Sequence, residues 1–232
     1  GGLFRHVRDL AMAHQRSGHQ VGVICDVAGT ACYNEEMVAE LSESLRLGLH
    51  RTRMHRAVGP GDIIDSRNIL KFIKELQPNV LHGHGAKGGV FARALGSLAR
   101  VERSRVARLY SPHGGSLHYG PESRAGRLYF RIERMLERLT DHILFVAEFE
   151  HRAYADKIGE PTCAWSINYN GLQPVEFEPV TPDEDAADFL FLGELRQLKG
   201  PDIFLRALAQ LRAEGRTAVR GVIVGDGPDA EN

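Results

Sequence analysis

An arginine and a lysine stand where an apolar strand is expected to pass into a helix. The segment FLFLGELRQLKGPDIFLRALAQL (189–211) is apolar, then basic at Arg196 and Lys199, then helical in its pattern. Gly200 would free the turn, and Asp202 favours the positive end of the following helix. Two cations beside a helix N-terminus can bind an anion, and a diphosphate is the expected ligand. The pattern predicts an anion site here, against the simpler interpretation of solvated charges beside a turn.

Three other segments place glycines or histidines where a strand is expected to meet a helix. They are GGLFRHV (1–7), HGHGAKGG (82–89) and SPHGG (111–115). In an open parallel sheet, ligands collect at the carboxyl ends of the strands, where helix N-termini present free N–H groups. One glycine at such a turn often gives only steric relief. Four such turns together predict a ligand site at the carboxyl ends of the strands.

Histidines occupy two of these turns. His82 and His84 alternate along a strand and could face one side, but a metal site would need a third ligand that the spacing does not supply. A packed or loop-capping histidine is the preferred interpretation, and no metal site is expected. His113 ends an apolar run and precedes Gly114, which leaves two roles open, a ligand contact or a structural turn. The acidic run at 183–185 lies among prolines, so we interpret it as solvated.

Strand-like and helix-like segments alternate along the chain. Helical spacing is found at 3–17, 62–76, 124–139 and 200–213, and apolar strand patterns at 20–26, 188–194 and 221–225. Such alternation predicts parallel β-α-β units with helices on both faces of a doubly wound sheet, which is the α/β class.

A proline-rich and acidic segment at 171–187 interrupts this alternation. We interpret it as a linker between a Rossmann-like first domain at 1–170 and the start of a second domain at 188–232. The second part holds one β-α-β unit, which cannot cover both faces of its own sheet, so this domain is expected to be incomplete.

The composition excludes some classes of function. The chain has 232 residues, 43% of them hydrophobic, and a net charge of −1, which gives no bias towards nucleic acid. Its three cysteines fit reduced cytoplasmic thiols. The helix at 124–139 carries a basic stripe that could lie on an anionic membrane. Glu133 and Glu137 dilute that charge, so we favour a surface helix with local ion pairs.

In combination, these motifs resemble glycosyltransferase family 4, the retaining nucleotide-sugar transferases of GT-B fold. GGLFRHVRDLAMAHQRSGHQVGVIC is similar to the family's Gly-Gly loop, first helix and second strand. VLHGHGAKGG and YSPHGG are similar to its histidine-bearing strand ends. LFVAEFEHRAYADKIG and INYNGL resemble its Ser-x-x-Glu and Pro-Asn-Gly segments, with Ala147 and Tyr169 as departures. FLGELRQLKG and GVIVGDGP resemble its phosphate clamp and Gly-x-Gly-Pro segments.

The resemblance implies two facing Rossmann-like domains with a nucleotide-diphosphate sugar in the cleft as donor, and no other cofactor. His113 would contact the transferred sugar and Lys199 would be the clamp lysine. Arg196 would replace an arginine that usually follows the glycine directly, where this chain has Glu194. Donor contacts are expected from Gly1, Gly2, His84, Gly114, Asn170, Gly193, Gly225 and Gly227.

The same resemblance implies a retaining, hexosyltransferase-type reaction on a glycan or lipid-linked acceptor in polysaccharide biosynthesis. It further implies a cytoplasmic location with peripheral contact at the inner membrane face. The family's Glu-x7-Glu segment is expected beyond Asn232 and its first strand before Gly1, so the chain alone is expected to be inactive.

Two other functions stay open, a GT-B-fold sugar-nucleotide epimerase and a non-catalytic sugar-nucleotide-binding relic. A dinucleotide-dependent oxidoreductase is disfavoured, because no complete Gly-x-Gly-x-x-Gly follows an early strand with an acidic residue downstream. The sequence identifies neither the donor nor the acceptor.

Overall fold

The computed structural model describes residues 2–26, 35–53, 61–101 and 104–230. The chain divides into two compact units, Gly1–Leu172 and Gln173–Asn232. The division falls within the segment expected to be a linker. The assignment of donor binding to the second part stays a prediction.

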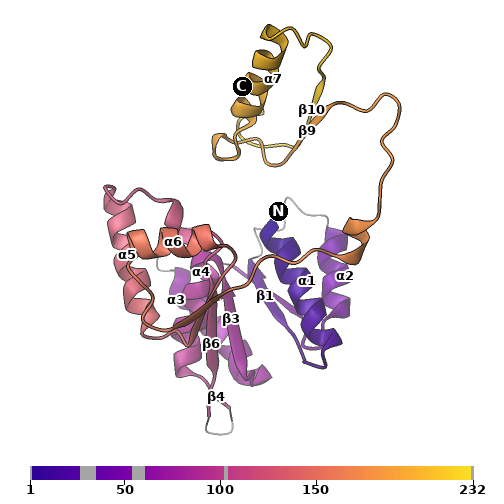
Figure 1. The fold of residues 1–232 in the computed structure, drawn as a ribbon. Coiled ribbons are helices and arrows are strands. Elements are labelled where there is room, and N and C mark those ends of the chain that lie inside the picture. Colours follow the sequence, from indigo (N-terminus) through magenta and orange to yellow (C-terminus); the bar gives the residue numbers. More distant parts are fainter. Residues whose placement is uncertain (1, 27–34, 54–60, 102–103, 231–232) are drawn as a thin grey trace. The chain divides into compact units, whose positions relative to one another are not determined.

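The main sheet of the first unit has four parallel strands. They are β3 (Val80–His84), β6 (Ala107–Ser111), β7 (His142–Phe145) and β8 (Ala164–Ile167), in the order β3-β6-β7-β8. Figure 1 shows β3 and β6 side by side, and α4 (Gly85–Leu98) leaves the end of β3 without an intervening loop. The α/β class with parallel strands is therefore confirmed.

A second parallel pair in this unit joins β1 (Val23–Asp26) to β2 (Leu49–Thr52). The sequence analysis missed β2 and the preceding helix α2 (Glu35–Ser44). Among the described residues, the pair β4 (Arg100–Val101) and β5 (Ser104–Arg105) is antiparallel and departs from the parallel pattern.

The remaining helices of the first unit are α1 (Gly2–Arg16), α3 (Gly61–Leu76), α5 (Arg124–Glu137) and α6 (Glu148–Lys157), with a 3-10 turn η2 (Gly115–His118). Their apolar faces build three buried clusters. One lies between α1 and α2, one between α3 and α4, and one around β6, β7 and α6. Burial of these faces holds the elements in place, because the apolar surface removed from water is the main favourable contribution to folding.

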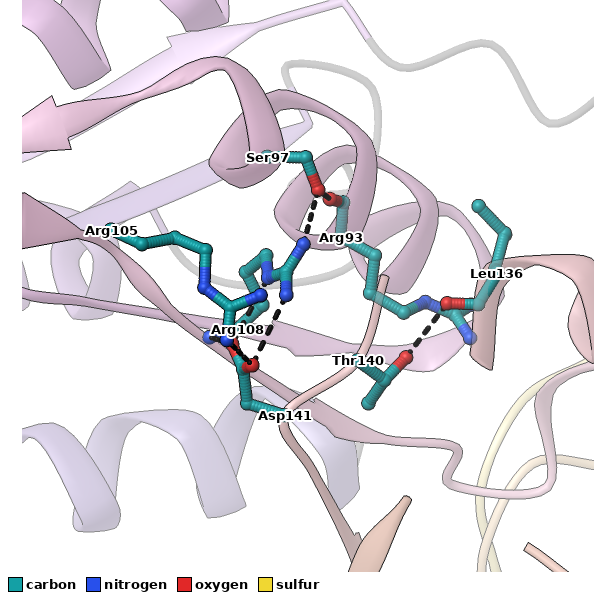
Figure 2. A network of polar contacts seen from close by, with 7 residues as sticks. All are labelled: Arg93, Ser97, Arg105, Arg108, Leu136, Thr140 and Asp141. Atoms are coloured by element: carbon teal, nitrogen blue, oxygen red, sulfur yellow. Dashed lines mark hydrogen bonds and ion pairs between the residues drawn. The ribbon is translucent and has the colours of Figure 1, made fainter. Parts of the chain in front are cut away.

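A bidentate ion pair fixes β6 against the start of β7 (Figure 2). Nε of Arg108 donates to Asp141 at 3.0 Å, and Asp141 also accepts a bond of 2.8 Å from the backbone N–H of Arg108. Arg105 donates to the same carboxylate at 2.6 Å. Arg108 also donates to the hydroxyl of Ser97 on α4. These bonds therefore tie the amino-terminal ends of β6 and β7 to the carboxyl-terminal end of α4.

Helix α5 differs from its sequence interpretation. Glu133 and Glu137 are buried, whereas Leu128 and Met135 are more than half exposed. The two carboxylates therefore do not dilute the surface charge of this helix. Glu133 turns inward because it pairs with an arginine of α4, and Arg134 bonds to Glu137 at 2.7 Å. Among helices within the described ranges, none has the length and apolar character to cross a membrane.

The second unit holds the parallel strands β9 (Phe189–Leu192) and β10 (Gly221–Val224), joined by α7 (Pro201–Ala213). Two 3-10 turns, η3 (Pro174–Phe177) and η4 (Gln197–Lys199), precede α7. Phe191 of β9 packs against Phe204 of α7, with ring centroids 5.7 Å apart. The strand-helix-strand order predicted for this part is confirmed.

Candidate functional site

The carboxyl ends of β3 and β6 bring two of the predicted site histidines together. His84 is the last residue of β3 and pairs in register with Ser111, the last residue of β6. His113 follows two residues later. Nδ1 of His84 lies 3.0 Å from Nε2 of His113, so the two imidazoles share one hydrogen bond.

A third histidine, His6 of α1, completes this group. Its ring centroid lies 4.9 Å from that of His113 and 5.6 Å from that of His84. One ring nitrogen from each histidine lies within 4.8 Å of the other two. The sequence analysis placed the segment 1–7 at a ligand edge but did not single out His6, because nothing in its spacing links α1 to β3.

His82 belongs to the packing of this group rather than to its open edge. Its ring packs against that of His84 in a tilted arrangement, with 3.9 Å between centroids, and its Nε2 forms a hydrogen bond of 2.9 Å with the hydroxyl of Ser111. The strand alternation therefore places both histidines on one side, as expected. The packed interpretation fits His82.

The imidazoles of this group are held neutral. Burial, with a smaller contribution from nearby histidines, lowers the pKa of His82 and of His113 to about 4. Burial also lowers the pKa of His84, to about 2, and that of His6. At neutral pH each ring therefore carries one N–H donor and one free lone pair.

The turn that carries His113 has an unusual backbone. His113 has a φ of 50° and Gly114 a φ of 76°, both in the left-handed region. Residues other than glycine rarely adopt this backbone conformation. Those that do are frequent at functional sites, where the surrounding structure stabilises the conformation. The conformation aims the imidazole towards His84 instead of continuing the strand.

Glu150 of α6 fixes the backbone of this turn. Its buried carboxylate accepts a hydrogen bond of 2.7 Å from the N–H of Gly114 and one of 2.8 Å from the N–H of Val146. Because its N–H is bonded to Glu150, Gly114 would have to contact a nucleotide-sugar donor through other atoms. The sequence analysis missed Glu150 as a positioning residue. The available signal was an acidic residue at the third position of a helix.

A buried ion pair lies beside the same turn. Nη1 of Arg93 donates to the carboxylate of Glu133 at 2.8 Å, and the arginine side chain has no exposed area. Glu133 also accepts from the hydroxyls of Tyr110 at 3.1 Å and Ser116 at 3.3 Å. This network joins α4, α5, β6 and η2, so it fixes the elements on both sides of His113.

The N-terminus of α1 lies near that of α4. A side chain at Gly85 would approach Leu3 of α1 at 3.8 Å. Gly2 is the first residue of α1 and lies at the positive end of the helix dipole, which favours a bound anion. Gly1 lies outside the described residues.

The predicted anion site in the second unit lies at the turn before α7. Gly200 has a φ of 75° and ends η4, and Pro201 opens the helix, as expected. Arg196 and Lys199 are exposed, and Arg196 lies 3.7 Å from the carboxylate of Glu194. An open depression of about 510 Å³ is lined by Arg196, Gln197, Leu198, Pro228 and Asp229.

The glycines of this unit serve a close backbone approach. A Cβ at Gly225 would lie 1.8 Å from the carbonyl oxygen of Gly193, and one at Gly227 would lie 2.3 Å from that of Leu195. The two turns therefore pack backbone against backbone. A donor contact by Gly193, Gly225 and Gly227 stays a prediction.

The predicted site residues thus fall into two groups. Gly2, His84, His113 and Gly114 lie at one edge of the first unit, and Gly193, Arg196, Lys199, Gly225 and Gly227 lie in the turns of the second. Asn170 is exposed in the segment after β8, near the end of the first unit.

Comparison with known proteins identifies the family. The model of Glycosyltransferase Family 4 matches residues 1–175. A Bacillus subtilis (strain 168) protein named "Putative glycosyltransferase EpsD" is 27% identical over 181 residues, covering 72% of this chain and 46% of that protein. A Klebsiella pneumoniae protein named "Uncharacterized 41.2 kDa protein in cps region" is 24% identical over 148 residues, covering 60% and 41%. The chain spans less than half the length of these curated relatives. Because the family model covers most of it, the chain belongs to glycosyltransferase family 4.

Proposed function

We propose that this protein transfers a sugar from a nucleotide-diphosphate sugar to a glycan or lipid-linked acceptor in polysaccharide biosynthesis, with retention of the anomeric configuration. The observation that carries the proposal is the turn at the end of β6, where His113 is held in a left-handed conformation beside His84. It lies within the part of the chain that the family model matches.

Such a reaction requires stabilisation of its leaving group, the nucleoside diphosphate. Breaking the anomeric C–O bond develops negative charge on the nucleoside diphosphate, and prepositioned cations stabilise that charge more than they stabilise the ground state. Lys199 and Arg196, at the N-terminal side of α7, are the proposed cations. With these two charges in place, the proposed reaction has no need of a divalent metal at the diphosphate.

His113 is proposed to contact the transferred sugar. A neutral imidazole can donate one hydrogen bond and accept another, which suits a sugar hydroxyl. The low pKa of His113 keeps it neutral at physiological pH. In this role Glu150 is a positioning residue, because it holds the N–H of the neighbouring Gly114.

Donor binding gives the first test. The chain would be titrated calorimetrically with a panel of nucleoside diphosphates and nucleotide sugars, with NAD as the ligand of the disfavoured oxidoreductase class. Saturable binding of one nucleoside diphosphate, weakened in Lys199→Ala but not in Arg216→Ala, supports the proposal. Arg216 is an exposed cation of the same unit and serves as the matched control. Binding of NAD in place of every nucleotide sugar would contradict it.

Analysis of the reaction products distinguishes a transferase from an epimerase and from a non-catalytic binding protein. An epimerase converts the bound sugar without an acceptor, and a binder leaves the donor unchanged. A transferase releases free nucleoside diphosphate in step with glycosylated acceptor, which chromatography of both products would reveal.

A further inference from the structure

His6, His84 and His113 form a cluster that the proposed transfer does not use as a unit. The histidines come from α1, from the end of β3 and from the turn after β6. One ring nitrogen from each lies within 4.8 Å of the other two, and the nitrogens of His84 and His113 are 3.0 Å apart. Three elements that are distant in sequence therefore present nitrogen atoms to a common point.

The chemistry of the cluster suits a Lewis acid. A neutral imidazole has one nitrogen lone pair that it can donate to a metal ion. In the hydrogen bond between His84 and His113, one nitrogen holds a proton between the rings. That proton can shift to the other nitrogen of its own ring, which frees both facing nitrogens without any net loss of protons.

We propose that His6, His84 and His113 bind one borderline divalent transition-metal ion of the Zn²⁺ class. Three imidazole nitrogens with a fourth, open position are a common ligand set for such an ion. At zinc-nitrogen distances of about 2.0–2.1 Å, tetrahedral nitrogens lie about 3.4 Å apart. The separations found here, from 3.0 Å to at most 4.8 Å, bracket that value, so small rotations of the rings produce the site.

The donor set also defines which ions are excluded. Mg²⁺ and Ca²⁺ prefer oxygen ligands, and this cluster offers only imidazole nitrogen. The ion has no step in the proposed transfer. Because it would occupy His113, it competes with the sugar contact, and this consequence alone rests on the proposed function.

Metal binding is tested without any measurement of activity. The chain would be prepared without a polyhistidine tag, stripped with a chelator, and titrated with Zn²⁺ by calorimetry and with Co²⁺ by visible absorption. We expect one ion per chain, with the intense visible bands of tetrahedral Co²⁺. Thermal stability should rise with Zn²⁺ and not with Mg²⁺, because an ion that binds only the folded state stabilises it.

The decisive variant is His6→Ala, because alanine is tolerated in the helix α1 and the fold should persist. We expect it to weaken Zn²⁺ binding roughly 100-fold or more, since loss of a partner outside the ligand set alone costs about 10–100-fold. His113→Asn should weaken Zn²⁺ binding to the same extent, and asparagine tolerates the left-handed backbone at this position. His19→Ala removes an exposed histidine and should leave binding unchanged.

Three results would overturn the proposal. They are the absence of saturable Zn²⁺ binding, binding that survives His6→Ala, and an equal loss in His19→Ala, which would assign the ion to surface histidines. Far-ultraviolet circular dichroism of each variant checks that a loss of binding is not a loss of fold.

Discussion

Nδ1 of His84 lies 3.0 Å from Nε2 of His113, although the two residues are 29 positions apart. The parallel register of β3 and β6 causes this, because it ends both strands at the same edge. The left-handed turn at His113 then returns its side chain to the strand end. The candidate site is therefore built by sheet register and by one unusual backbone conformation.

Replacement of His113 tests the sugar contact. Asparagine at this position keeps the left-handed backbone but removes the imidazole, so in the full-length enzyme we expect His113→Asn to lower kcat for transfer about 100-fold. The free energy of unfolding should change little. His19→Asn is the matched control, and equal activity of the two variants would contradict the role of His113.

Glu150 is expected to act through position rather than through contact with substrate. Glu150→Gln replaces one of the two carboxylate acceptors that bind the N–H groups of Gly114 and Val146 with an amide donor. We expect kcat to fall roughly 10-fold while KM for the donor changes little, because a small misplacement of a catalytic group costs rate. The exposed Glu148, in the first turn of the same helix, gives the control Glu148→Gln. A change confined to KM would contradict the positioning role.

The buried pair of Arg93 and Glu133 should dominate the stability of the first unit. Glu133→Gln leaves the arginine charge uncompensated in the interior, which typically costs about 3–5 kcal/mol. The single tryptophan, Trp165, lies in β8 and reports unfolding of this unit by fluorescence during denaturation in urea. Arg127→Ala on the exposed face of α5 should stay within about 0.5 kcal/mol. A loss below about 1 kcal/mol in Glu133→Gln would contradict this ranking.

Asp141 should make stability depend on pH in a defined direction. Hydrogen bonds from the side chain of Arg108 lower the pKa of this carboxyl below its usual value. Its stabilisation is therefore present at neutral pH and lost as the pH falls through the folded-state pKa. Asp141→Asn should cost about 1–2 kcal/mol at neutral pH, because the pair is partly exposed.

The difference between the native protein and Asp141→Asn should stay constant from about pH 7 to about pH 5 and shrink below about pH 4. Urea denaturation across this range measures it. A difference that grows on acidification would mean that the carboxylate is destabilising and that the assigned cause is wrong.

Lys199 is expected to contribute more to diphosphate binding than Arg196. Arg196 lies 3.7 Å from Glu194, which offsets part of its charge, whereas the described residues offer Lys199 no ion pair. Loss of a hydrogen bond to a charged group costs about 1.5–3 kcal/mol, so Lys199→Ala should weaken nucleoside diphosphate binding roughly 10–100-fold. Arg196→Ala should weaken it less. The reverse order in calorimetric titrations would contradict this assignment.

Local patterns were enough to predict the alternation of elements and the approximate ends of α1, α3, α7 and β10. Helical spacing and β-branched runs depend on near neighbours, and these patterns held. The sequence did not predict β2, which is short and half-buried, with no run of β-branched residues. It misjudged Glu133 because the arginine that draws this residue inward comes from another helix.

The candidate site was also predicted only in part, because some of its contacts join segments that are distant in the sequence. Glycine and histidine at strand ends indicated the edge, and His84 and His113 do meet there. His6 of α1 and Glu150 of α6 join them through contacts with the turn after β6, which no spacing along the chain reveals. The absence of a metal site was expected because the spacing of His82 and His84 supplies no third ligand, and this expectation stays a prediction. The metal site proposed above uses His6, which lies on a separate helix.

The central claim is transfer of a sugar from a nucleotide-diphosphate donor. The most direct measurement, made on the full-length protein, follows nucleoside diphosphate and glycosylated acceptor together, with the panel of donors and with glycan and lipid-linked acceptors. The account predicts release of the diphosphate in step with product, only when an acceptor is present, and strongly reduced in His113→Asn and Lys199→Ala. Conversion of the bound sugar without an acceptor, or release that is equal in all variants, would contradict it.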